Sequence, residues 1–155
     1  MPRESQVLLV ANRTAMTARL REAVRSLAAQ RGNTRFHLLV PAHPRGLHRV
    51  VDPEVAGREE AKARLAAAIP FLREAAGREV TGEIGSADPL AAIQDVLGRE
   101  RFDELLISTQ PRRMSRWLKL DLPSKARILG LPVTHIEAAE VPEELSPEVL
   151  AERAA

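Results

Sequence analysis

Short apolar runs alternate with helix-spaced apolar residues along most of this sequence, and this alternation limits the folds open to the chain. Residues 6–11 (QVLLVA) form a nearly continuous apolar run, which is typical of a strand buried on both faces. Four more segments have strand character, and a segment with helical features precedes each of them. The sequence predicts these further strands at residues 35–40, 79–84, 103–108 and 133–136.

The order β-α-β-α-β-α-β-α-β predicts an α/β fold with a doubly wound, open, parallel five-stranded sheet of the Rossmann-like kind. The expected strand order is 3-2-1-4-5, with right-handed crossovers and helices on both faces. The chain has 155 residues, enough for one domain with a substantial core. We expect one α/β domain over residues 1–137 and an acidic C-terminal tail over residues 138–155. With one Trp, three Phe and no Tyr, the core must be largely aliphatic.

Two prolines fall inside segments that otherwise read as helices. Pro70 lies within the apolar stripe that leads from Ala61 to Ala76, and an interior proline costs about 3 kcal/mol. The sequence therefore predicts that this helix is kinked or shortened at Pro70. The basic stretch 112–129 is expected to be partly helical and broken at Pro123.

Several classes of function lack the residues they need. There is no cysteine, which excludes disulfides, thiol catalysis and thiolate zinc sites. No phosphate-binding glycine loop, nucleophile elbow or His-Glu-x-x-His motif is present. His37 and His135 fall in expected strands, and His43 and His48 share a loop without metal-ligand spacing. We therefore expect no metal site, no catalytic residues and no enzymatic activity.

The expected location is the cytoplasm, with no membrane attachment. The apolar run nearest the start of the chain, residues 7–11, is far shorter than a signal peptide or a membrane-spanning helix requires.

Charge is spread unevenly along the chain, although the net charge is only +2. Residues 1–51 carry nine Arg against two Glu, and residues 108–136 carry six basic residues against one Asp. In the expected sheet, the loops after strands one, two and four meet where the chain reverses direction, and open α/β sheets bind ligands at that point. Those loops hold Arg13, Arg45, Arg49, Arg112, Arg113 and Arg116.

Arginines gathered in this crevice suggest a small anionic ligand. A guanidinium group binds phosphate or carboxylate through paired hydrogen bonds and needs no glycine loop to do so. The alternative is that an arginine-rich chain simply places solvated side chains in its loops.

Residues 103–136 carry a resemblance to a known family. The segment reads DELLISTQPRRMSRWLKLDLPSKARILGLPVTHI, an Asp-led apolar strand followed by a loop, a helix and a final strand introduced by proline. It resembles the C-terminal half of a universal stress protein. The apolar first strand and the Gly85-x-x-Asp88-Pro89 lead into the third helix agree with this, so the resemblance covers roughly residues 5–137.

The resemblance implies a universal-stress-protein-like fold and a stress-linked binding or signalling role. It also implies ATP or AMP as ligands and a homodimer. The strand that begins at Val133 and ends at Ile136 would otherwise be an exposed apolar edge, so we expect the homodimer to form there.

The glycines that the family uses for nucleotides are missing. Its nucleotide-binding members carry Gly-x-x-Gly, nine residues, and then Gly-Ser or Gly-Thr, which here falls on Ser108, Pro111, Asp121 and Leu122. Pro111 has no N–H, Asp121 would place negative charge beside phosphates, and Leu122 has no hydroxyl. After the first strand, Asn12-Arg13-Thr14 replaces the usual Asp-Gly-Ser. These departures argue against ATP binding in the family manner.

The candidate ligand-binding residues lie at the carboxyl ends of strands one, two and four and in the loops that follow. They are Asn12, Arg13, Thr14, Val40, Ser108, Thr109, Arg112, Arg113 and Arg116.

Other functions remain open at the level of the sequence. A weak nucleotide hydrolase would need a metal-binding carboxylate, and Asp121 is the acid best placed to supply it. Nucleic-acid binding through the basic face is a further alternative, but Trp117 is the one aromatic residue in the basic stretch and is expected to pack against the domain or a partner subunit. The acidic tail from Glu137 to Glu152 either covers the crevice or is solvated.

Overall fold

The computed structural model describes residues 3–42 and 53–138, with side chains in the second range described from residue 57 onward. Strands and helices alternate along these residues. In chain order they are β1 (Ser5–Val10), α1 (Ala18–Arg31), β2 (Thr34–Pro41), α2 (Pro53–Ala76), β3 (Val80–Gly85), α3 (Pro89–Arg99), β4 (Glu104–Thr109), α4 (Arg116–Lys119), α5 (Leu122–Arg127) and β5 (Val133–Glu137).

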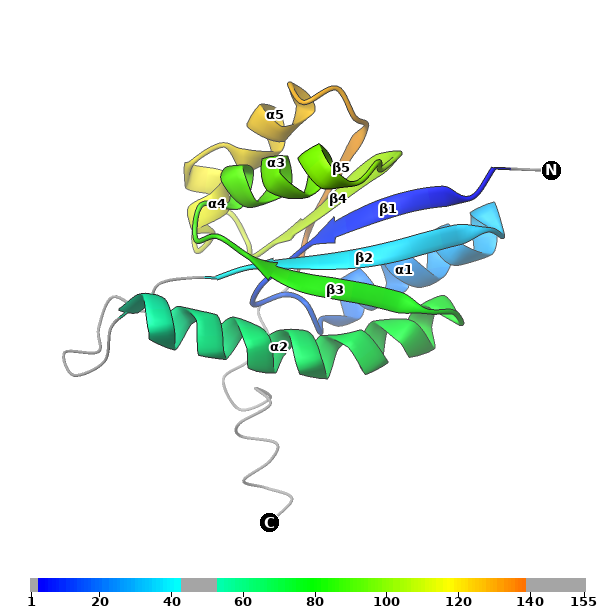
Figure 1. Ribbon diagram of the computed structural model, residues 1–155, viewed down its shortest axis with the longest axis horizontal. Helices are drawn as coiled ribbons and strands as arrows, with labels where there is room; N and C mark the ends of the chain where they lie inside the picture. The colour runs from blue at the N-terminus through cyan, green and yellow to red at the C-terminus, as the bar shows by residue number, and fades with distance from the viewer. Residues whose placement is uncertain (1–2, 43–52, 139–155) are drawn as a thin grey trace, which may run out of the picture.

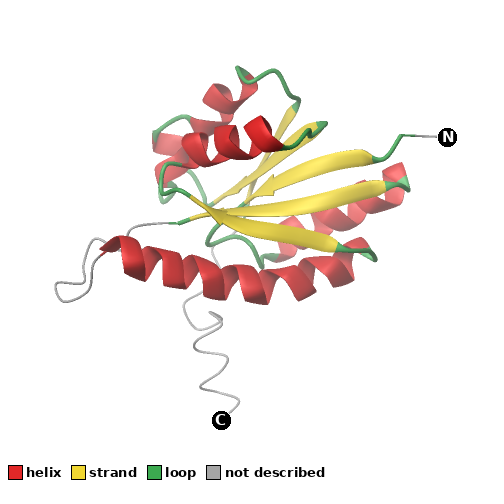
Figure 2. Cartoon of the chain, viewed as in Figure 1, coloured by secondary structure: helices red, strands yellow, loops and turns green. Residues whose placement is uncertain are grey.

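The five strands form one parallel sheet in the order β3-β2-β1-β4-β5 (Figures 1 and 2), which confirms the predicted topology. β1 lies at the centre, where Val7 pairs with Phe36 of β2 on one side and with Glu104 of β4 on the other. The chain reverses the direction in which it adds strands between β1 and β4. The loops that leave the carboxyl ends of these two strands therefore diverge and leave room for a ligand.

The core lies in two layers, one on each face of the sheet. Val7 and Leu9 face the layer under α1 and α2, whereas Leu8 and Val10 face the layer under α3, α4 and α5. This alternation follows from the two-residue repeat of a strand, and all four side chains are fully buried. Trp117 is buried in the second layer. The core is aliphatic in the main, as predicted.

Pro70 does not shorten α2, so of the two predicted effects, a kink or a shortening, the second is wrong. The helix continues through Pro70 to Ala76 as one element (Figure 1). Pro70 and Ala66 are exposed, so the Ala66 carbonyl that loses its helical donor faces water, which can hydrate it. Long helices also curve with their convex side toward solvent, and that is the side on which a proline ring is accommodated best. None of the helices described here is long and apolar enough to span a membrane.

The basic stretch forms two short helices, and the break between them lies before Pro123. α4 ends at Lys119, and Asp121 then adopts a left-handed conformation with φ 57° and ψ 42°. Pro123 follows in the first turn of α5, where its missing N–H has no helical partner to lose. Thus the predicted interruption is confirmed, and it lies at Leu120 and Asp121, just before Pro123.

Candidate functional site

A cavity of about 210 Å³ opens between the carboxyl ends of β1 and β4, the two neighbouring strands between which the winding direction of the sheet changes. The loop after β1, the end of β4 and the beginning of α4 form its walls. Its lining residues are Asn12, Arg13, Thr14, Ser108, Thr109, Gln110, Met114, Ser115, Arg116 and Trp117. None of these residues is acidic. Within residues 3–42 and 53–138, no group of three His, Asp or Glu side chains is placed to hold a metal ion.

Hydrogen bonds join the loop after β1 directly to the end of β4, and both partners line the cavity. The Thr14 hydroxyl lies 2.7 Å from the Ser108 hydroxyl and donates to the Ser108 carbonyl at 3.1 Å as its other contact. Both residues are buried, and buried hydroxyl groups need hydrogen-bond partners. The Thr14 and Ser108 hydroxyls serve as partners for each other. The bond holds the loop after β1 against the end of β4, which fixes the spacing of the two walls.

Asn12 is held by contacts on the α2 side of the sheet. Its Nδ2 donates to the Pro41 carbonyl at 2.6 Å, and its Oδ1 accepts a hydrogen bond from Arg64. Arg64 also contacts Glu60, one turn earlier on α2, at 3.2 Å. The amide of Asn12 is therefore oriented by the end of β2 and by α2, and its side chain is nearly fully buried.

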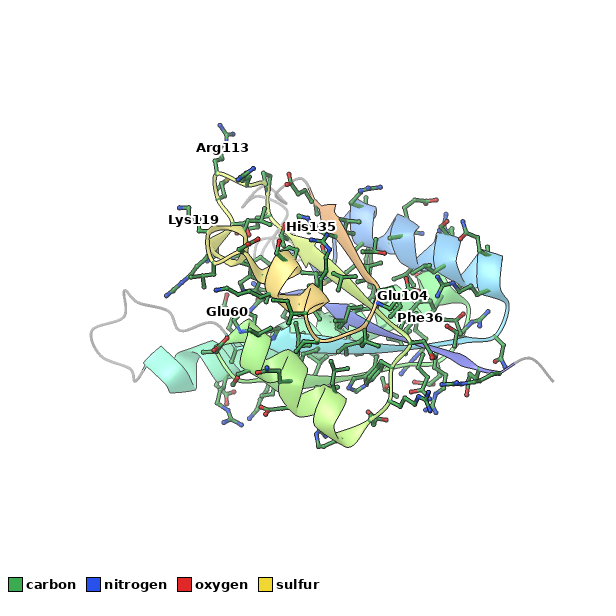
Figure 3. The ribbon with its side chains drawn as sticks, turned by 90° about the horizontal axis from the view of Figure 1, so that it is seen from above. Phe36, Glu60, Glu104, Arg113, Lys119 and His135 are labelled. Atoms are coloured by element: carbon green, nitrogen blue, oxygen red, sulfur yellow. The ribbon has the colours of Figure 1, made fainter. Side chains whose placement is uncertain are left out.

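Two arginines line the cavity and two others do not. Arg13 approaches from the loop after β1, and Arg116 from the first residue of α4. Both are exposed, and neither forms an ion pair with another described residue. Arg112 and Arg113 lie in the turn before α4 but are not among the lining residues, and Figure 3 shows the Arg113 side chain extending away from the protein.

The structure thus brings six of the predicted site residues to one cavity: Asn12, Arg13, Thr14, Ser108, Thr109 and Arg116. Val40 does not reach it, because its side chain is fully buried in the core layer under α1 and α2. Arg45, Arg49, His43, His48 and the acidic tail from residue 139 lie outside the described residues.

Five contributors were missed by the sequence analysis. Gln110, Met114, Ser115 and Trp117 line the cavity, and Arg64 contacts Asn12 from behind. Gln110, Met114 and Ser115 lie between β4 and α4, and Trp117 is the second residue of α4. Composition and charge in this segment carry no signal for which side chains line a cavity. No local signal links Arg64 to Asn12, since 52 residues separate them.

Several polar groups of the loop after β4 form hydrogen bonds within the loop. The N–H groups of Met114 and Ser115 both donate to the Pro111 carbonyl, at 2.8 and 3.0 Å, and Pro111 has no N–H. The Ser115 hydroxyl accepts from the N–H of Leu118 at 3.2 Å, which caps α4. These three groups are therefore occupied within the loop.

One position of the family's glycine pattern nevertheless keeps the backbone conformation that glycine favours. The pattern places glycine at position 121, and Asp121 there has a φ of 57°. It is the one non-glycine residue with positive φ among those described. Aspartate tolerates this region better than most residues, although at a cost that glycine does not incur.

His135 contacts the cavity wall from β5. Its Nε2 lies 2.8 Å from Oγ1 of Thr109, which is almost completely buried. Burial lowers the pKa of His135 below its ordinary value of 6.5; Glu137 acts in the opposite direction, and Arg127 adds to the lowering. The imidazole is therefore neutral at neutral pH.

These features define an open α/β protein with a cavity at the point where its sheet changes winding direction. No protein-family model matches the chain, and no relative is found among curated proteins. The similarity that is found lies in solved structures.

A universal stress protein family member from Burkholderia pseudomallei matches with a TM-score of 0.61 and 16% identity, over 86% of this chain and 96% of that one. The universal stress protein from Archaeoglobus fulgidus in complex with dAMP matches with a TM-score of 0.55 and 18% identity, over 88% and 100%. A family protein from Arabidopsis thaliana with AMP bound gives 0.53 and 14%, over 94% and 98%. The chain has the universal stress protein fold.

Proposed function

We propose that this chain is a binding protein that holds a small phosphate- or carboxylate-bearing molecule in the cavity between β1 and β4. The observation that carries this proposal is the pair Arg13 and Arg116, which line the cavity from separate walls, with no acidic residue among the described residues of the lining. Guanidinium groups bind such anions through paired, charge-assisted hydrogen bonds.

The proposal includes nucleoside monophosphates as ligands. Proteins of the same fold have been solved with dAMP and with AMP bound. Because the loop after β4 offers no glycines, the phosphate would here be bound by arginine side chains and not by a backbone cradle. Given the fold, we further propose that the bound ligand serves a stress-linked signalling role and that the chain performs no reaction of its own. Asp121, on which hydrolysis would depend, is exposed and does not line the cavity.

Two double variants with equal loss of charge test this proposal. Arg13→Ala with Arg116→Ala removes the lining arginines, whereas Arg112→Ala with Arg113→Ala removes two neighbours outside the cavity. Calorimetric titration with AMP, inorganic phosphate and sulfate should show binding weakened at least about tenfold in the first variant, since a hydrogen bond to a charged group contributes about 1.5–3 kcal/mol. The second variant should change affinity by less than about threefold, as expected for exposed charges at a distance.

Equal losses in both variants would mean that the anion responds only to the general positive charge of this face. Absence of binding of all three anions to the wild-type protein would overturn the proposal. Thermal unfolding of each variant without ligand controls for damage to the fold.

A further inference from the structure

The wall of the anion cavity is connected to a titratable group by one hydrogen bond. Thr109 is 2% exposed and lines the cavity, and its Oγ1 lies 2.8 Å from Nε2 of His135 on β5. Figure 3 labels His135 among the side chains of this region.

The side chains of both residues lie on the face of the sheet that carries α4 and α5. Leu105 and Ile107 of β4 are buried in that layer, and Thr109 follows them at the two-residue spacing of a strand. On β5, Val133 packs against the same layer and His135 follows it at the same spacing. Thr109 lines the cavity together with Ser115 and Trp117, and its hydroxyl contacts His135.

A hydroxyl group has one proton to donate, so its partner on one side decides what it offers on the other. In the neutral imidazole that carries its proton on Nδ1, Nε2 is an acceptor, so the Thr109 hydroxyl donates to it and presents lone pairs to an anion. When His135 is protonated, Nε2–H donates to Thr109 Oγ1. The hydroxyl proton is then free to donate to an anion, and the imidazolium adds a positive charge nearby.

We propose that protonation of His135 switches Thr109 into a donor toward the cavity and thereby strengthens anion binding. This inference rests on the proposed function and adds a proton-dependent control to it. The switch transfers one proton from solvent to the imidazole, and no bond between heavy atoms forms or breaks.

The charged surroundings of His135 set the direction of this switch. Among the described residues, Glu137 on β5 and Arg127 on α5 act on it, from its own strand and from the helix packed on this face. Burial lowers the pKa of His135, so the site rests in the neutral state at neutral pH. Anion affinity should consequently rise as the pH falls below 6.5 and through the pKa of the folded protein.

Sulfate is the probe of choice, because unlike phosphate it keeps its charge throughout this range. The full chain would be titrated calorimetrically with sulfate between about pH 7.5 and about pH 5, with His135→Gln and Thr109→Val as variants. Gln offers a nitrogen near the position of Nε2 but does not titrate, and Val keeps the shape of Thr without its hydroxyl. We expect wild-type affinity to rise at least about tenfold toward low pH, corresponding to one charge-assisted hydrogen bond. We expect the rise to vanish in His135→Gln and to shrink in Thr109→Val.

An independent readout follows from reciprocity. If the protonated imidazole favours sulfate, saturating sulfate must raise the pKa of His135, which an NMR titration of its ring proton measures. The same measurement in Arg13→Ala with Arg116→Ala should show no sulfate effect.

The outcomes separate the two proposals. A wild-type protein that binds no sulfate at any of these pH values overturns the proposed function. Binding that is independent of pH, or a pH dependence retained in His135→Gln, overturns the switch and leaves the anion site standing. A full pH dependence in Thr109→Val shows that the charge of His135 acts without the hydroxyl, which also overturns the switch.

Discussion

Gly82 occupies the middle of β3, where α2 crosses the sheet without space for a side chain. A Cβ added there would come within 2.6 Å of Leu65 Cδ1 and 2.9 Å of Ile69 Cδ1. The Leu38 carbonyl oxygen, a backbone atom, would lie at 3.0 Å. The close contact of α2 with β3 thus depends on one missing methyl group.

The same substitution at two glycines should have opposite effects on stability. Gly82→Ala should lower the free energy of unfolding by about 1 kcal/mol, the low end for overpacking, because the tips of Leu65 and Ile69 can shift. Gly98 lies near the end of α3, and a Cβ added there would have nothing within 4 Å. Gly98→Ala should therefore raise the free energy of unfolding by about 0.5 kcal/mol through helix propensity. Urea unfolding measures both; a stabilised Gly82→Ala would contradict the packing described for α2.

Among the helices, α2 contains a proline where helix propensity alone would forbid it. Pro70 is on the exposed side and the helix passes through it. Replacing it with alanine restores a donor to the Ala66 carbonyl and gives up the restriction that proline places on the unfolded chain.

We expect Pro70→Ala to raise the free energy of unfolding by about 1–3 kcal/mol. Pro89→Ala is the matched control, because Pro89 is buried in the first turn of α3, where proline is suited to the helix. That variant should be neutral or less stable. If Pro70→Ala instead lowers the midpoint of urea unfolding, the packing of α2 on the sheet requires the curvature that proline imposes.

The strands could be predicted well from the sequence because each buried strand is a short apolar run between polar turns, as in residues 6–11. The end of a helix was harder to predict. Pro70 signals a break, but which face of the helix it occupies depends on tertiary packing. In the basic stretch, the left-handed Asp121 gives no composition signal comparable to that of Pro123.

The site could be predicted where it follows from topology and not where it follows from side-chain direction. The strand order placed Asn12, Thr14 and Ser108 together, because the carboxyl ends of neighbouring parallel strands meet. It could not tell Arg116, which lines the cavity, from Arg113, which points away. Arg113 and Arg116 are only three positions apart, and the direction of each side chain depends on how α4 is placed.

At the scale of the whole molecule, the sheet has an open edge at β5 within the described residues. Hydrogen bonds from Leu105 N to the Pro132 carbonyl and from Ala138 N to the Thr109 carbonyl fix which backbone groups face β4. By the alternation of a parallel ladder, those of Val133, His135 and Glu137 face outward. We expect a homodimer that uses this edge, since an unpaired edge strand readily joins a second strand.

Light scattering during gel filtration should give twice the chain mass for the wild-type protein. Val133→Pro removes an outward N–H and should shift the protein toward the monomer with little change in thermal unfolding. Thr134→Pro removes an N–H directed at β4 and should lower the unfolding temperature clearly. A monomeric wild-type protein, or a dimer unaffected by Val133→Pro, would contradict the use of this edge.

The left-handed conformation of Asp121 affects which substitutions this chain can readily accept in evolution. An aspartate codon becomes a glycine codon through the change of a single base, and the backbone at this position already has the shape that glycine prefers. A mutant lineage could therefore acquire a glycine here without refolding the loop and with its strain relieved. Pro111 is different: its codon is two base changes from glycine, and its carbonyl accepts the two hydrogen bonds that close the turn before α4. Formation of a phosphate-binding backbone loop would thus be gradual, and the change of Asp121 to glycine is its accessible first step.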